Sequence, residues 1–213
     1  MTTIAPAYDQ SFRAELKSLL HWRRDVRKFR ADAVDEALFQ EILDTAGLAP
    51  SVGLSEPWRL VTVDEPGRRE AIRANFCRCN EAALAAQEGG DRAGLYARLK
   101  LEGLQQAPRQ VAVFVDPDPE QGSGLGRQTM PETVAYSAVL AVHTMWLTAR
   151  AAGLGLGWVS ILEADAVRDA LEVDRSWRLI AYLCLGYPAQ ESHTPELERV
   201  GWERRRRLPP LRR

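Results

Sequence analysis

The sequence predicts a single layered domain of the α+β or α/β class, spanning residues 1–213. Between three and five short apolar stretches, several of them rich in β-branched residues, alternate with stretches of helical periodicity. This alternation is typical of a sheet covered by helices. The 213 residues are 46% hydrophobic and 27% charged, which is ample for one hydrophobic core and short for two domains.

Composition excludes several classes of partner. The formal net charge of -1 gives no overall attraction to nucleic acid or to a membrane surface. No apolar run approaches the roughly 18 residues of a membrane span, so we expect a cytoplasmic protein. Cys77, Cys79 and Cys184 lack zinc-ligand spacing, and we expect them to be reduced and structural, with no metal site.

In the first third of the chain, apolar residues recur at helical spacing over residues 11–22 and again after Asp32, which we expect to cap the second helix. Residues 49–58 contain two prolines, one glycine and two serines, which predict a loop, and residues 58–63 read as a strand.

Helices are expected over residues 66–86, 91–106, 131–152 and 165–171, and strands over residues 110–115, 155–162 and 179–185. Residues 116–128 contain two prolines and three glycines and predict a mobile loop or lid. The helix over residues 131–152 is apolar on more than one side. We therefore expect it to cross the middle of the domain or to pack against a second subunit.

The stretch Arg23-Arg24-Asp25-Val26-Arg27-Lys28-Phe29-Arg30 places five cations around one carboxylate. Guanidinium groups match phosphate oxygens two at a time, so this stretch is suited to binding an anion. A solvated basic turn is the alternative. From these eight residues alone, the simplest interpretation of Asp25 is an internal counter-ion.

Four motifs occur along the chain in a fixed order. They are the Arg-Arg-x-x-Arg of residues 23–27, the Ala49-Pro50-Ser51 loop that ends in Pro57-Trp58, the glycine run from Gly153 to Trp158, and Gly186-Tyr187-Pro188. In this order they resemble the nitroreductase-like flavoprotein family over nearly the whole chain. Residues 49–58, 124–132, 157–162, 195–197 and 201–203 resemble in particular the subgroup that makes 5,6-dimethylbenzimidazole.

The resemblance implies an α+β nitroreductase-like fold, with a mixed central sheet flanked by helices, in an intertwined homodimer that binds FMN at the subunit interface. The subgroup uses reduced FMN as substrate and O2 to form 5,6-dimethylbenzimidazole, the lower ligand of cobalamin, and erythrose 4-phosphate. NAD(P)H or a partner flavin reductase would supply the reducing equivalents. No nucleic acid or membrane partner is implied.

The resemblance also implies roles for individual residues. Asp25 and Ser160 are expected to be catalytic, Asp25 by handling protons and Ser160 by orienting or deprotonating the ribityl carbon. The residues expected to contact the flavin are Arg23, Arg24, Arg27, Pro50, Ser51, Val52, Lys100, Val159 and Ser160. Residues 124–132 resemble a lid that excludes water.

Each assignment has a plainer alternative. Ser160 resembles an edge serine bonded to backbone, Lys100 a helix-surface lysine, and the loop at residues 50–52 a routine helix-to-strand connection. Gly153, Gly155 and Gly157 precede a strand, so they fail the context of a dinucleotide fingerprint and are expected to permit close approach of backbone to a helix or to flavin.

The loop also departs from the common pattern. Leu54 stands where many nitroreductases have asparagine, and Glu56 where a neutral amide is usual. Two other functions remain open: an NAD(P)H-dependent nitro- or quinone reductase, and a flavin carrier without activity. The pair Asp25 and Ser160, together with the lid at residues 124–132, distinguishes the synthase subgroup from the reductase, and a carrier would not need the pair.

Overall fold

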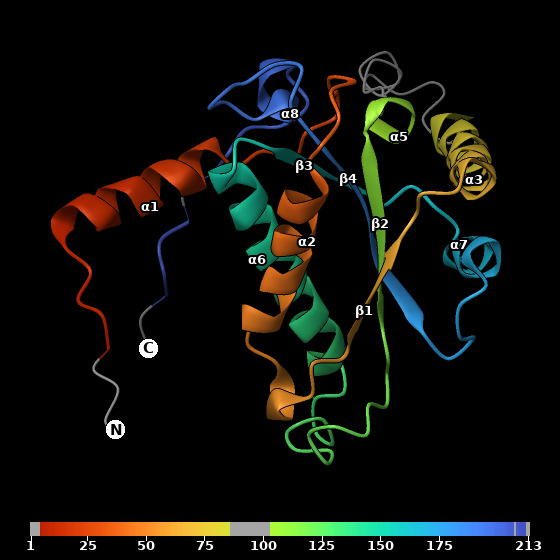
Figure 1. Ribbon diagram of the computed structural model, residues 1–213, viewed down its shortest axis with the longest axis horizontal. Coiled ribbons are helices and arrows are strands. Elements are labelled where there is room, and N and C mark those ends of the chain that lie inside the picture. Colours follow the sequence, from red (N-terminus) through yellow and green to blue (C-terminus); the bar gives the residue numbers. More distant parts are fainter. Residues whose placement is uncertain (1–4, 86–102, 207, 212–213) are drawn as a thin grey trace.

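A four-stranded sheet forms the centre of the molecule (Figure 1). The computed structural model describes residues 5–85, 103–206 and 208–211. The strands are β1 (Trp58–Thr62), β2 (Arg109–Val115), β3 (Gly155–Val159) and β4 (Arg178–Gly186), in the order β1-β2-β4-β3. Every pair of neighbouring strands is antiparallel. The sheet is therefore antiparallel, whereas a mixed sheet was expected. The only parallel pairing among the described residues is an isolated bridge between Asp25 and Leu156.

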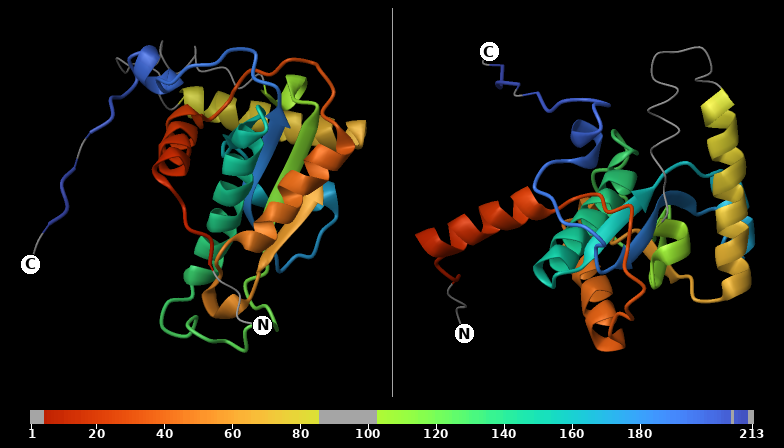
Figure 2. Two further views of the ribbon diagram at one scale, coloured as in Figure 1. Left: turned by 60° about the vertical axis from the view of Figure 1, so that its left-hand side comes forward. Right: turned by 90° about the horizontal axis from the view of Figure 1, so that it is seen from above.

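Helices cover both faces of the sheet (Figures 1 and 2). One face carries α2 (Glu36–Asp44) and α6 (Thr133–Ala151), and the other carries α3 (Pro66–Ala85) and α7 (Ala164–Leu171). The remaining helices are α1 (Gln10–Trp22), α5 (Gly103–Gln106), α8 (Glu196–Arg199) and the short 3-10 turns η1 (Thr45–Leu48) and η2 (Val52–Leu54). The predicted layered α+β class is therefore confirmed.

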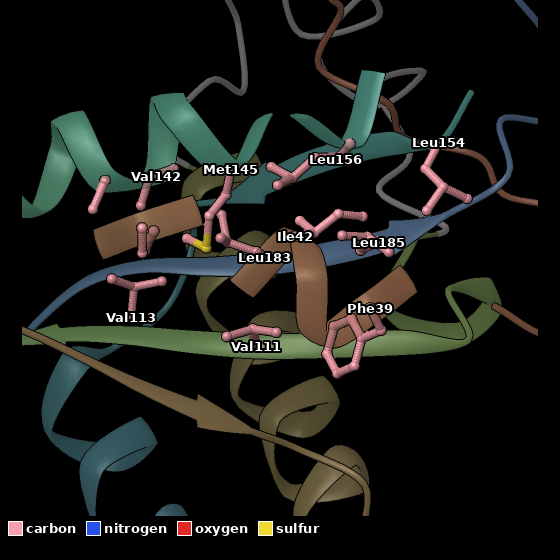
Figure 3. Close-up of a cluster of buried hydrophobic side chains, with 14 of the residues drawn as sticks. Phe39, Ile42, Val111, Val113, Val142, Met145, Leu154, Leu156, Leu183 and Leu185 are labelled. Carbon is pink, nitrogen blue, oxygen red and sulfur yellow. The ribbon is translucent and has the colours of Figure 1, made fainter. Parts of the chain in front are cut away.

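The core has two parts because the sheet is covered on both faces. On one face, side chains of α2 and α6 such as Phe39, Ile42 and Met145 pack against Val111 and Leu183 of the central strands (Figure 3). The second cluster lies on the other face and contains Ile72, Phe114, Val167, Leu171 and Tyr182. Central strands buried on both faces explain why the sequence of β2 is almost continuously apolar.

The long helix α6 crosses the domain against the sheet, as its sequence predicts. Seven of its residues are buried: Val134, Ser137, Ala138, Ala141, Val142, Met145 and Ala149. Its outer side still exposes Tyr136, Val139 and Leu140, at 54%, 39% and 44% of their surface. The apolar outer side is the part of the helix that the single chain leaves unpacked.

Helix α1 projects from the body of the molecule (Figures 1 and 2). Asp9 caps it by accepting the Phe12 N–H at 2.8 Å, yet none of its residues is buried. Phe12, Leu16 and Leu20 recur every four residues and remain exposed at 44%, 41% and 45%. Such a stripe on a helix is normally covered.

Two boundaries differ from the sequence prediction. Asp32 does not cap α2, because its carboxylate is paired with Arg30 at 2.7 Å, and Asp35 instead accepts the Leu38 N–H at 3.0 Å. Strand β3 ends at Val159, so residues 160–162 are not part of it. The helix expected over residues 91–106 lies mostly outside the described residues, apart from α5. Within the described part of the chain, no helix has both the length and the apolar character needed to cross a membrane.

Candidate functional site

The cationic segment, residues 23–30, lies along the edge of the sheet formed by β3. The Val26 N–H donates to the Leu156 carbonyl at 3.1 Å. Further along, Arg30 N–H donates to the Tyr187 carbonyl at 2.8 Å, and Ala189 N–H donates to the Lys28 carbonyl at 3.0 Å. The segment is thus held between β3 and the chain that follows β4, which fixes the position of its backbone.

Two glycines of β3 make this close approach possible. A Cβ on Gly157 would overlap the Val26 carbonyl oxygen, and one on Gly155 would lie 2.6 Å from Val26 Cγ2. The predicted close approach thus occurs at Gly155 and Gly157, but the neighbour is the cationic segment and not a helix. A Cβ on Gly153, the third glycine of the prediction, would meet nothing within 4 Å. Phe29, 4% exposed, anchors the segment in the core.

Asp25 is fixed from two sides. Its Oδ1 accepts the backbone N–H of Trp158 at 2.8 Å, and its Oδ2 lies 3.7 Å from Arg27 Nε. Burial raises the pKa of the Asp25 carboxyl, against the opposing effects of the Trp158 N–H, Arg27 and Arg23. The side chain nonetheless keeps 40% of its surface open, and it lines a cavity.

The Asp25 cavity has a volume of about 230 Å³. It is bounded by the cationic segment and by the chain from Gln190 to Val200, which includes α8. Arg27 Nε also lies 3.6 Å from Glu196 Oε2, so one guanidinium is shared between two carboxylates. A smaller cavity of about 150 Å³ adjoins it and adds Arg23 and Arg205 to its lining.

Arg23 and Arg24 stand beside the same cavities. The Arg23 guanidinium lies 4.8 Å from the centre of the Trp146 ring, and Trp146 Nε1 donates to the Arg24 carbonyl at 3.0 Å. The Arg24 side chain donates to the His193 carbonyl, while its buried Nε has no hydrogen-bond partner among the described residues. Burial lowers the pKa of both arginines, and the positive charge of Arg205 lowers each further. Clustered cations of this kind favour a bound anion.

Ser160 lies directly after β3, two residues beyond Trp158, and is exposed. Within the described chain its hydroxyl has no hydrogen-bond partner, so it is not an edge serine bonded to backbone. It does not line the Asp25 cavity. Val159 is 4% exposed and belongs to the core, which leaves its backbone as the part able to contact a ligand.

The loop at Pro50, Ser51 and Val52 lies at the other end of α6. Val52 N–H donates to Ser137 Oγ at 3.0 Å near the start of the helix, whereas Arg24 contacts Trp146, nine residues further on. Nine residues of helix rise roughly 14 Å. Ser51 Oγ accepts the Glu56 N–H at 3.1 Å, which leaves its O–H free to donate. A single chain therefore does not bring this loop to the cationic segment.

The predicted lid packs on that same loop. Gln121 Nε2 donates to the Leu54 carbonyl at 2.6 Å, and a Cβ on Gly122 would lie 2.7 Å from the Gly53 carbonyl oxygen. Leu54 and Glu56 have φ angles of 53° and 41°, a strained conformation that is concentrated at functional sites. Lys100 lies outside the described residues.

Sequence reasoning missed two groups at this site. The Trp158 N–H is a backbone donor, and no residue type marks such a group in a sequence. Glu196 lies within Pro195-Glu196-Leu197, a stretch that carries part of the resemblance, but nothing in its sequence indicated that it would meet Arg27. Among all the residues that the structure describes, no group of three or more histidine, cysteine or acidic side chains is arranged to hold a metal ion.

Comparison with known proteins identifies the family. The model of the nitroreductase family matches residues 20–187. The chain belongs to the nitroreductase family. Among nitroreductase relatives, it is 55% identical over 208 residues to 5,6-dimethylbenzimidazole synthase of Rhodospirillum rubrum, with 98% of each chain covered.

A second nitroreductase relative, 5,6-dimethylbenzimidazole synthase of Rhodobacter capsulatus, is 46% identical over 196 residues, covering 92% of this chain and 94% of its own. The fold resembles the crystal structure of oxidized iodotyrosine deiodinase bound to FMN and 3-iodo-L-tyrosine. The TM-score is 0.72 at 21% identity, over 93% of this chain and 97% of that one. These findings confirm the predicted nitroreductase-like fold.

Proposed function

We propose that this nitroreductase-family protein fragments reduced FMN with O2 to give 5,6-dimethylbenzimidazole and erythrose 4-phosphate. The observation that carries the proposal is Asp25, a carboxylate held at 2.8 Å by the Trp158 N–H beside cavities whose lining includes several arginines. An acid placed there is suited to moving a proton of a bound anionic substrate. The likeness to two synthases over almost the full chain supports the same reaction.

The cationic residues fit the phosphate of FMN. The positive charge of Arg205 lowers the pKa of both Arg23 and Arg24, and the Arg24 Nε is buried without a hydrogen-bond partner in the described part of the chain. A phosphate would offset this repulsion and supply acceptor oxygens. The related fold of iodotyrosine deiodinase is bound to FMN in its crystal structure, which supports flavin as the ligand here.

Reduced FMN supplies the electrons that react with O2. The protein's part is to hold a proton donor and acceptor beside the flavin. The Trp158 N–H and Arg27 orient the two oxygens of Asp25. The raised pKa of the carboxyl lies closer to neutral pH, and a group whose pKa is near the working pH can both give and take a proton. Ser160, whose hydroxyl has no partner among the described residues, orients the ribityl chain.

The complete site requires a second copy of the chain. The loop at residues 50–52 and the cationic segment lie at different ends of α6, and the outer side of α6 and the stripe on α1 are both apolar and exposed. A homodimer that buries these faces would bring the loop of one protomer to the segment of the other.

Two other functions are distinguished by the reaction products. An NAD(P)H-dependent reductase oxidises reduced FMN without breaking it, and a flavin carrier releases it unchanged. Neither requires the fixed carboxylate of Asp25. In the proposed reaction, NAD(P)H or a partner flavin reductase supplies reduced FMN. We place the protein in the cytoplasm, where its three free cysteines would stay reduced.

Aerobic incubation of the protein with chemically reduced FMN, followed by chromatography, tests the proposal. We expect 5,6-dimethylbenzimidazole and a matching loss of flavin. Recovery of all the flavin as intact oxidised FMN would contradict the synthase function and leave the reductase or the carrier. Ser160→Ala should abolish the product while FMN binding is retained.

A further inference from the structure

Asn75 is a buried polar residue of α3 that the proposed reaction does not use. It is 2% exposed. Its Nδ2 donates to the Glu163 carbonyl at 3.0 Å, and its Oδ1 accepts the Glu163 N–H at 3.0 Å. One side chain therefore satisfies both backbone groups of a residue 88 positions away.

Glu163 ends the short link that begins with Ser160. The link, residues 160–163, joins β3 to α7, and Glu163 occupies the N-cap position of α7 without a side-chain cap of its own. At the other end, Val159 is held by pairing with Tyr182 of β4. The link is thus fixed at both ends, by the sheet before Ser160 and by Asn75 after it.

We propose that Asn75 is a positioning residue that holds Ser160 in place by clamping Glu163, an inference that rests on the proposed function. Ser160 is exposed, and no hydrogen bond of its hydroxyl within the described chain fixes its position. Its position therefore depends on the backbone of the link. A displacement of about 1 Å in a reacting group can cost on the order of a hundredfold in rate.

The residue type suits the clamp. A single short amide offers one donor and one acceptor side by side, which is what the C=O and N–H of one residue require. Aspartate keeps the acceptor, loses the donor and adds a charge at a buried position. Leucine has a similar volume and offers neither. Cys79 Sγ also donates to Asn75 Oδ1, at 3.3 Å, but does not contact the link.

The test compares Asn75→Leu and Asn75→Asp with two controls. Cys79→Ala removes the neighbouring contact and leaves Glu163 paired. Ile72→Val shortens a fully buried side chain of the same helix, so it lowers stability while leaving Asn75 and its two bonds to Glu163 in place. Amide hydrogen exchange over residues 159–164, dimethylbenzimidazole formed per reduced FMN consumed, and FMN affinity are measured for each.

In the wild type, we expect the Glu163 amide to exchange slowly although the residue itself is exposed. Asn75→Leu should lose that protection, whereas Asn75→Asp keeps an acceptor for the Glu163 N–H and loses the bond to the Glu163 carbonyl. Both variants should yield about ten- to a hundredfold less product per flavin consumed, with FMN affinity changed less than about threefold. The two control variants should keep both the protection of the Glu163 amide and the product yield per flavin consumed. Product yields in the Asn75 variants that match those of Ile72→Val would overturn the inference.

The proposed function can fail separately. If the wild type forms no dimethylbenzimidazole, the synthase proposal is lost together with any effect on Ser160 chemistry, and the exchange data alone then decide whether Asn75 clamps the link. If Asn75→Leu does not fold, Asn75→Asp and the protection of Glu163 in the wild type carry the test. Rapid exchange of the wild-type Glu163 amide would overturn the clamp itself.

Discussion

The carboxylate of Asp25 accepts the backbone N–H of Trp158 at 2.8 Å, across 133 residues of sequence. This bond joins the cationic segment to β3 two residues before Ser160. Together with the bond from Val26 N–H to the Leu156 carbonyl, it makes the segment an extension of the sheet. The backbone that carries the acid and the arginines is therefore hydrogen-bonded to the strand that leads to Ser160.

The stability of the ligand-free protein should depend on pH through Asp25. Burial raises the folded-state pKa of Asp25 above its ordinary 3.8, so the folded chain holds this proton more tightly than the unfolded chain. The resulting stabilisation is complete below pH 3.8 and is lost as the pH rises through the folded-state pKa. Asp25→Asn should therefore gain stability relative to the wild type as the pH increases. Urea unfolding between pH 4 and 8 measures the difference, and parallel curves would show that Asp25 is not perturbed.

Removal of one cation should weaken binding of the phosphate group. Arg23→Gln deletes a charge beside the cavities, and hydrogen bonds to charged groups contribute about 1.5–3 kcal/mol. FMN affinity should fall by roughly ten- to a hundredfold, whereas riboflavin, which lacks the phosphate, should bind as before. Arg30→Gln is the matched control, because Arg30 belongs to the same segment but pairs with the exposed Asp32. Equal losses for FMN and riboflavin would mean that Arg23 does not contact the phosphate.

Gly157→Ala should separate the segment from β3. The new Cβ would overlap the Val26 carbonyl oxygen, which is backbone and has little room to move. We expect a loss of about 1–3 kcal/mol in the free energy of unfolding, together with weaker FMN binding. Gly47→Ala is the control, since a Cβ there meets nothing within 4 Å. Chemical denaturation measures the stability of the two variants. A Gly157→Ala protein as stable as the control would contradict this packing.

A charge on the outer side of α6 should disrupt the proposed dimer. Leu140 is 44% exposed there, and Leu140→Glu would place a carboxylate in an apolar interface. We expect the dimer dissociation constant to rise by at least about tenfold, as measured by analytical ultracentrifugation. Ala82→Glu on the exposed side of α3 introduces the same charge on the other face of the sheet and should leave the assembly unchanged. A wild type that is monomeric at all concentrations would rule out the shared site.

Periodicity predicted most elements of the fold. The helix α6 and the strands β2 and β4 were recognisable because long apolar runs have few alternative structures. The cap of α2 was not, because Asp32 and Asp35 are chemically equivalent in sequence and only the ion pair with Arg30 assigns the first of them elsewhere. The antiparallel sheet order depends on tertiary packing that no local pattern encodes.

The site was predictable in part. Arg23, Arg24, Asp25 and Arg27 are neighbours in sequence, and the structure keeps them around one pair of cavities. The Trp158 donor and Glu196 come from distant elements, so only the folded chain reveals them. The separation of the loop at residues 50–52 from this cluster likewise follows from the length of α6 and had no local signal.

The most direct test of the proposed function compares product formation by the wild type and Asp25→Asn from reduced FMN in the presence of O2. Asparagine keeps the acceptor for the Trp158 N–H but cannot exchange a proton as a carboxyl does. We expect the wild type to form 5,6-dimethylbenzimidazole, and Asp25→Asn to bind FMN comparably yet form at least about a hundredfold less product. Equal product yields from the two proteins would contradict it.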